Sequence, residues 1–217
     1  MNPSIELVQL GPLAQLRTGR LVRRLAQLMI GLVFYGVSMA MMIRGNLGLS
    51  PWDALHVGLT GHFPLSFSEV VIYVSFLVLL LWIPLREIPG VGTIANALVI
   101  GLSADLALQV LDAPGHLGAR LLLTVGGVLL CGLGSALYIG AQLGRGPRDG
   151  LMTGLQRVTG RSLRLVRTVL EMTVLLMGLL LGGLEMLGVG TLLFSVLIGP
   201  LTQALLPWTL VAPECRR

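Results

Sequence analysis

The sequence predicts an all-α integral membrane protein with six transmembrane helices, built as two inverted three-helix repeats that each contain a short non-spanning helix. The composition indicates a membrane protein, because 54% of the 217 residues are hydrophobic and only 12% are charged, too apolar for a soluble domain. The repeats are indicated by a 13-residue pattern that occurs twice, at 47–59 and 143–155, 96 positions apart.

The two copies share L-G-x-x-P-x-D-x-L-x-x-G-L, and the gap-free match extends over 21–59 and 117–155. A second echo, G-V-G-T at 90 and again at 188, has an offset of 98. Two signatures at nearly one spacing indicate an internal duplication. Because the duplication includes the first apolar run, we expect that run to be retained as a membrane helix rather than cleaved as a signal peptide, despite the arginines before it.

The elements of the first repeat follow from apolar runs and helix signals. The first span is predicted over 25–43 and a short helix over 51–60. At ~1.5 Å per residue, the short helix covers about half of a ~30 Å hydrocarbon core and cannot span it. Two further runs, 65–85 and 91–111, predict the second and third spans.

The second repeat follows a polar loop and has the same order of elements. Its predicted spans are 121–139, 165–184 and 189–211, with a short helix over 147–158. The chain therefore divides into a cytoplasmic lead over 1–19, repeats over 20–112 and 113–211, and a cytoplasmic tail over 212–217.

The distribution of arginine predicts the orientation. With six spans and a cytoplasmic N-terminus, thirteen of the fifteen basic residues fall inside, and only Arg44 and Arg120 fall outside. The inner set is Arg17, Arg20, Arg23, Arg24, Arg86, Arg145, Arg148, Arg157, Arg161, Arg164, Arg167, Arg216 and Arg217. This asymmetry predicts a multi-pass membrane protein with both termini cytoplasmic. Basic residues scattered between apolar runs are not a nucleic-acid surface, so the expected partner is the lipid bilayer.

Ligand-binding candidates gather at the starts of the short helices. Pro51 and Pro147 suit the first helical position, and Asp53 and Asp149 lie in the first turn. An intramembrane carboxylate in each repeat could bind a cation or a proton. The structural alternative is that each aspartate stabilises the helix dipole, by about 0.3–1 kcal/mol. His56, one turn beyond Asp53, is a further candidate.

Polar residues inside the third and sixth spans are weaker candidates. Asp105 has Gln203 as its repeat equivalent, whereas Asn96 is matched by apolar Phe194. These residues could line a pathway, and hydrogen bonding between helices explains them equally well.

Arginines after the second motif could bind an anion or a lipid headgroup. These candidates are Arg145, Arg148, Arg157, Arg161 and Arg164. The alternative is that they are the positive-inside signal itself, with Arg167 and Glu171 paired at i, i+4. No catalytic motif and no full metal-ligand set occurs in the sequence, so we predict neither an enzyme nor a cofactor.

The motifs also resemble a known family. The run 48–53, the segments 83–86 and 90–93, and G-R-G-P-R-D-G-L-M-T-G-L at 144–155 are similar to the YczE family of bacterial multi-pass membrane proteins and, more distantly, to the YitT family. The resemblance implies a plasma-membrane location. It implies no substrate and no ligand residue, since the biochemical activity of that group is not established.

Inverted repeats with short helices are typical of secondary transporters. The leading hypothesis is therefore transport of a small solute or ion by alternating access. The alternative is a non-transporting accessory or regulatory protein that acts through its arginine-rich cytoplasmic face, on a protein partner or on a second copy of itself.

Overall fold

The computed structural model describes residues 19–211, in which the regular structure is helical throughout. Six segments are long and apolar enough to cross a membrane, which confirms the six predicted spans. They are α2 (Leu21–Gly45), α4 with α5 (Phe67–Leu80 and Trp82–Leu85), α6 (Val91–Val110), α7 (Leu117–Gly140), α9 (Leu163–Gly182) and α10 (Val189–Thr209). The predicted lead and tail, with Arg17, Cys215, Arg216 and Arg217, lie almost wholly outside the described residues.

The short helices α3 (Pro51–Thr60) and α8 (Pro147–Thr159) begin at the predicted prolines. A 3₁₀ turn, η1 (Leu184–Met186), precedes α10. The predicted second span differs in one respect, because α4 ends at Leu80 and α5 resumes at Trp82. Pro84 accounts for the break, since its ring clashes with a helical carbonyl four residues earlier, at Leu80.

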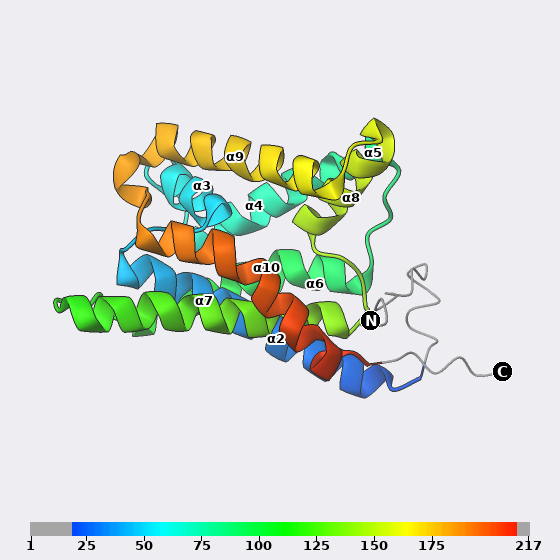
Figure 1. Cartoon of the computed structure of the whole chain (residues 1–217), viewed down its shortest axis with the longest axis horizontal. Helices are drawn as coiled ribbons and strands as arrows, with labels where there is room; N and C mark the ends of the chain where they lie inside the picture. Colours follow the sequence, from blue (N-terminus) through cyan, green and yellow to red (C-terminus); the bar gives the residue numbers. More distant parts are fainter. Residues whose placement is uncertain (1–18, 212–217) are drawn as a thin grey trace.

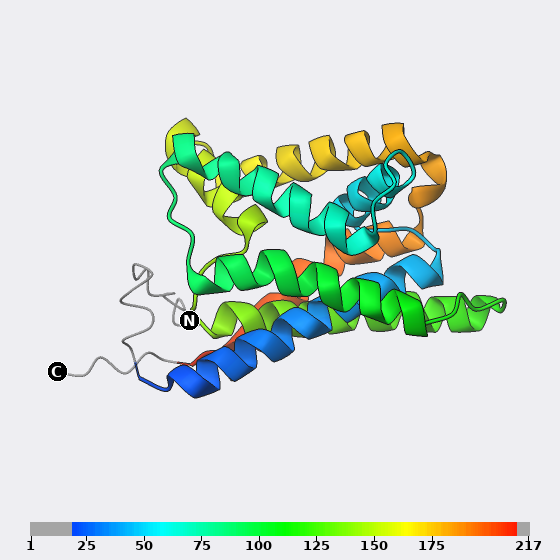
Figure 2. The ribbon, with the colours of Figure 1, turned by 180° about the vertical axis from the view of Figure 1, so that it is seen from behind.

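The helices form two layers (Figures 1 and 2). One layer contains α2, α6, α7 and α10, and the other contains α3, α4, α8 and α9. The apolar side chains form two cores, and the first of them also includes Phe67 and Val71 of α4. The first core is centred on α2 and α7 around Leu32 and Val128, and the second joins α3, α4, α5, α8 and α9 around Trp82 and Val174.

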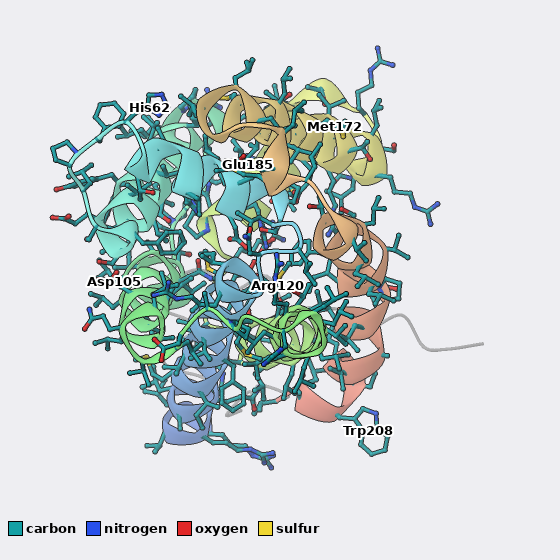
Figure 3. All side chains as sticks on the ribbon, turned by 90° about the vertical axis from the view of Figure 1, so that its left-hand side faces the viewer. His62, Asp105, Arg120, Met172, Glu185 and Trp208 are labelled. Carbon is teal, nitrogen blue, oxygen red and sulfur yellow. The ribbon has the colours of Figure 1, made fainter. Side chains whose placement is uncertain are left out.

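Two arginines tie α2 and α7 together in opposite directions. Arg24, at the start of α2, donates from Nε to the carbonyl of Ala141 (2.8 Å) and from Nη2 to that of Gln142 (2.7 Å), just beyond the end of α7. Arg120, near the start of α7, donates to the carbonyls of Gly45 and Asn46 at the end of α2, and Figure 3 shows it between the two helices. Each arginine therefore satisfies carbonyls that the other helix leaves unpaired at its C-terminus.

Glycines allow α2 and α7 to approach closely. A Cβ added at Gly31 would lie 2.7 Å from the backbone nitrogen of Tyr138 and 2.9 Å from the carbonyl oxygen of Gly134. Both neighbours are backbone atoms, so the helices themselves would have to separate.

We expect Gly31→Ala to destabilise the protein by about 1–3 kcal/mol, because overpacking costs more than the helix propensity gained. Thermal unfolding in detergent micelles checks this. Gly118→Ala is the matched control, since Gly118 lies in the same helix pair with no atom within 4 Å of an added Cβ. An equal response of the two variants would contradict the close-packing argument.

The two G-V-G-T segments hold the loops that precede the short helices. The N–H of Gly190 donates to the carbonyl of Leu47, and the N–H of Gly92 donates to that of Leu143, both at 2.7 Å. Gly48 and Gly144 have φ values of 112° and 126°, which favour glycine. The G-V-G-T segment of each repeat therefore binds the loop that leads into the other repeat's short helix.

The two short helices run towards opposite ends of the molecule. Along α3, Ala54 packs against Gly178 and Gly58 against Gly182, so α3 runs in the same direction as α9. Along α8, the carbonyl of Pro147 accepts from Trp82 Nε1 (2.9 Å) and Gly154 packs against Leu85, so α8 runs with α4 and α5. Since α9 and α5 end at opposite ends of the bundle (Figure 1), the N-termini of α3 and α8 are their inner ends.

Candidate functional site

A cavity of about 70 Å³ lies where the two layers meet. Helices α2, α6 and α7 line it from one layer, and α3, α4 and α8 from the other. Both short helices contribute their first turns. Its main polar side chains are Tyr35, Asp53, His56, Asn96, Arg148 and Asp149.

On the α8 side, tyrosines of the first layer hold the motif's charged residues. Arg148 Nη2 donates to the hydroxyl of Tyr35 (2.8 Å), and its guanidinium carbon lies 5.9 Å from the centre of the Tyr35 ring, a cation–π distance. The hydroxyl of Tyr138 donates to Asp149 Oδ2. Tyr35 and Tyr138 meet edge to face, with ring centres 6.4 Å apart. Tyr35 therefore positions the positive Arg148, and Tyr138 positions the negative Asp149.

On the α3 side, two buried polar atoms have no hydrogen-bond partner. Trp52 is 8% exposed and His56 is 6% exposed, yet Trp52 Nε1 and His56 Nδ1 are both unpaired. The His56 ring packs against Phe67 with 6.1 Å between centres. Because nearly all buried polar groups in proteins are hydrogen-bonded, these atoms indicate a place where a solute or water completes the bonding.

Asp53 is 4% exposed, and α3 lies outside the six spans. Ser50 caps the helix by accepting from the N–H of Asp53 (3.2 Å), a common role for serine before the first helical turn. Burial raises the pKa of Asp53 to about 6, and Ser50 and the Arg148 guanidinium oppose that rise. Burial, with the nearby Arg148, lowers the pKa of His56 to about 3, so His56 is neutral at pH 7 and its Nδ1 either donates or accepts, depending on the tautomer.

Glu171 of α9 is a further acidic residue near this site, since its charge acts on both Asp53 and Arg148. Its Oε2 is buried without a hydrogen-bond partner, and its charge raises the pKa of Asp53. The predicted Arg167–Glu171 ion pair is wrong, since within residues 19–211 the salt bridge is Arg157–Glu87 at 3.1 Å. The two residues are four apart on α9, but that spacing does not fix where Glu171 points, and here its carboxylate is buried.

Comparison with known proteins identifies the family. The family model described as "Family of unknown function (DUF6198)" matches residues 22–207. The chain belongs to this family. It is 38% identical to an uncharacterized protein of Haemophilus influenzae, over 81% of this chain and 80% of the relative. It is 33% identical to the uncharacterized membrane protein YczE of Bacillus subtilis, over 82% of each chain, which confirms the resemblance drawn from the motifs. No solved structure matches the chain.

The DUF6198 structure brings only some of the sequence candidates together. Asp53, His56, Asn96, Pro147 and Asp149 line the cavity, whereas Pro51 is buried but does not line it.

Two of the remaining candidates lie elsewhere. Asp105, labelled in Figure 3, accepts from Ser68 Oγ (3.3 Å), which fits the packing role. Gln203 is exposed on α10. The tyrosines Tyr35 and Tyr138 were missed, because a tyrosine inside an apolar run carries no signal that separates a core residue from a site residue.

The arginine candidates of this family member divide into two groups. Arg148 faces the cavity. Arg145, Arg157 and Arg161 instead border a polar groove of about 440 Å³ with Glu87 and Thr153, while Arg164 is exposed outside the groove lining.

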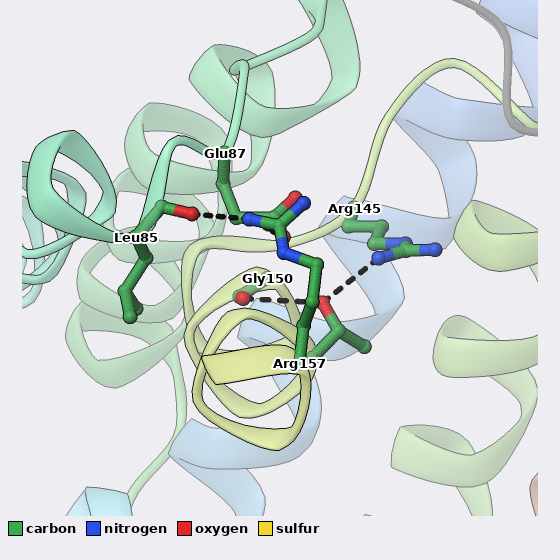
Figure 4. Close-up of polar contacts among 6 residues, drawn as sticks. Leu85, Glu87, Arg145, Gly150 and Arg157 are labelled. Atoms are coloured by element: carbon green, nitrogen blue, oxygen red, sulfur yellow. Dashed lines mark hydrogen bonds and ion pairs between the residues drawn. The ribbon is translucent and has the colours of Figure 1, made fainter. Parts of the chain in front are cut away.

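Figure 4 shows the contacts that shape this groove. Arg145 Nη1 donates to Thr153 Oγ1 (2.8 Å), and Arg157 binds Glu87 and the carbonyl of Leu85. Much of the groove's charge is therefore already engaged. Across residues 19–211, no group of three or more His, Cys, Asp or Glu side chains is placed to hold a metal ion.

Proposed function

We propose that this protein moves a small polar solute or ion across the bacterial plasma membrane by alternating access. The observation that carries the proposal is that the first turns of α3 and α8 line the same cavity. Short helices whose N-termini meet inside the membrane domain are the arrangement with which secondary transporters bind solutes. A bundle with a purely structural role would fill this position with leucine and glycine, whereas here charged side chains line it.

The repeated contacts support an inverted duplication. The Arg24 and Arg120 hydrogen bonds join antiparallel helices at positions 96 residues apart. The Gly92 and Gly190 bonds are also repeat equivalents, because their acceptors, Leu143 and Leu47, are 96 positions apart. The cavity lies where the two layers meet. One layer moving against the other would therefore open the cavity first to one side of the membrane and then to the other.

The positive-inside rule places the α8 end of the molecule in the cytoplasm. We expect a cysteine at His62 to react with an impermeant maleimide in intact cells, and a cysteine at Thr159 to react only after permeabilisation. Both parent residues are exposed and lie at opposite ends of the bundle. The background carries Cys131→Ala and Cys215→Ser, and labelling of both sites after permeabilisation is the control. Reaction of both sites in intact cells would contradict the proposed topology.

The direct test of transport is an unbiased solute screen in reconstituted vesicles, with and without a pH gradient. Protein-dependent accumulation of a solute supports the proposal. Vesicles that match empty ones for every solute, under both conditions, would count against a carrier.

The polar groove of Glu87, Arg145, Thr153 and Arg157 favours a second candidate, an accessory protein that binds a partner at this face. In that case Arg145→Gln with Arg161→Gln would abolish the protein's ability to complement a strain that lacks it, while substitutions in the cavity would leave complementation unchanged. A carrier requires the reverse pattern.

A further inference from the structure

We propose that the central cavity binds a small zwitterion, with its carboxylate held by Arg148 and its ammonium group by Asp53. This inference rests on the proposed function of the cavity and names the class of solute that the cavity accepts.

The first step is that two opposite charges share the cavity without touching. Asp53 comes from α3 and Arg148 from α8, and both line the same space. They influence each other electrostatically, yet no ion pair within 4.0 Å joins them in the described part of the chain. Opposite charges in a low-dielectric site attract strongly. A ligand that carries both charges can lie between Asp53 and Arg148 and be attracted to each of them.

The second step is the charge balance of the lining. Arg148 contributes one positive charge, and the N-termini of α3 and α8 contribute roughly half a charge each. Asp53 and Asp149 contribute two negative charges. The lining is therefore close to neutral but contains separate positive and negative groups, which suits a neutral molecule with separated charges better than a free anion or a free cation.

The third step is that unpaired hydrogen-bonding atoms face the same space. Trp52 lines the cavity beside Asp53 and its Nε1–H has no acceptor, and Nδ1 of His56 is also unpaired. The Asn96 amide, from the opposite layer, lines the cavity as well. A carboxylate offers an acceptor for the unpaired indole N–H of Trp52.

The fourth step is size. Drug-sized ligands occupy pockets of roughly 300–1,000 Å³, whereas this cavity is about 70 Å³. Such a volume holds a few water-sized groups and excludes a nucleotide or a lipid. The class that remains is a zwitterion of the size of the smallest amino acids.

The test measures binding to the purified full-length protein in detergent micelles at pH 7. Isothermal titration calorimetry uses glycine, alanine and serine as zwitterions, acetate as the carboxylate alone, and methylamine as the ammonium alone. We expect at least one zwitterion to bind at least tenfold more tightly than acetate and methylamine. We expect Arg148→Gln and Asp53→Asn each to weaken that binding at least tenfold. Arg164→Gln, which removes the same charge from an exposed position outside the cavity, should leave it unchanged.

Arg148→Lys guards against a folding defect, because it keeps the charge and should bind more tightly than Arg148→Gln. Acetate or methylamine binding as tightly as the zwitterions overturns the inference. In that event, loss of binding in Arg148→Gln or Asp53→Asn would still support the cavity as a solute site, so the two proposals fail separately. Absence of zwitterion binding also overturns the inference, whatever the solute screen in vesicles finds.

Discussion

Arg148→Gln is expected to lower solute accumulation in reconstituted vesicles by about 100-fold, while the protein still folds and inserts. Charge-assisted hydrogen bonds contribute about 1.5–3 kcal/mol each, and 2.7 kcal/mol corresponds to roughly a factor of 100. Arg148 faces the cavity and one of its N–H groups donates to the Tyr35 hydroxyl, so its other charged N–H groups can donate to a solute. Initial uptake rates of a solute found by the screen give the measurement.

Two variants separate a site role from a general effect of charge. Arg157→Gln removes one positive charge from the same helix but outside the cavity, and uptake should change less than twofold. Tyr35→Phe removes the acceptor that orients Arg148 and should reduce uptake by about tenfold, since the guanidinium stays but is less well held. Equal losses in Arg148→Gln and Arg157→Gln would mean that net charge, rather than the cavity, governs uptake.

Arg24→Ala is expected to lower stability by about 2–4 kcal/mol. Arg24 is 0% exposed, and its removal leaves the buried carbonyls of Ala141 and Gln142 without their donor, at about 1–3 kcal/mol each. For a chain of this length, that loss corresponds to a fall of roughly 5–15 °C in unfolding temperature. Thermal unfolding of the purified protein in detergent micelles measures it.

The neighbouring residue provides the control. Arg23 carries the same charge one position earlier and is exposed, so Arg23→Ala changes the membrane-flanking charge equally and should shift the unfolding temperature by less than 2 °C. If Arg24→Ala and Arg23→Ala had the same unfolding temperature, the hydrogen bonds from Arg24 to the end of α7 would contribute nothing to stability beyond the charge.

Much of the fold was predictable because the bilayer imposes lengths and the helix starts carry explicit signals. Ser50 with Pro51 defined the start of α3, which the sequence predicted at both bounds. The six spans followed from hydrophobic runs alone. The break between α4 and α5 was missed, although Pro84 lies four residues after the end of α4. It was missed because the residues on both sides of the break are apolar and read as one continuous span.

The site was only partly predictable, because charge statistics give the side of a membrane and not the direction of a side chain. Arg148 belongs by composition to the cytoplasmic arginines, yet α8 begins inside the bundle and turns this one residue towards the cavity. Asp53 and Asp149 were identified because they occupy equivalent positions in the two repeats. Tyr35 and Tyr138 could not be identified, since their repeat equivalents are Cys131 and Met42 and neither pattern nor spacing distinguishes them.

The exchange of contacts between the repeats has a consequence for synthesis at the ribosome. When residues 20–112 have been translated, the carbonyls at the end of α2 still await Arg120, and α3 still lacks the surface of α9 on which it packs. The N-terminal half is therefore an open structure until the C-terminal half is inserted. Two half-length polypeptides expressed together should combine into a native protein, whereas either fragment expressed by itself should be degraded.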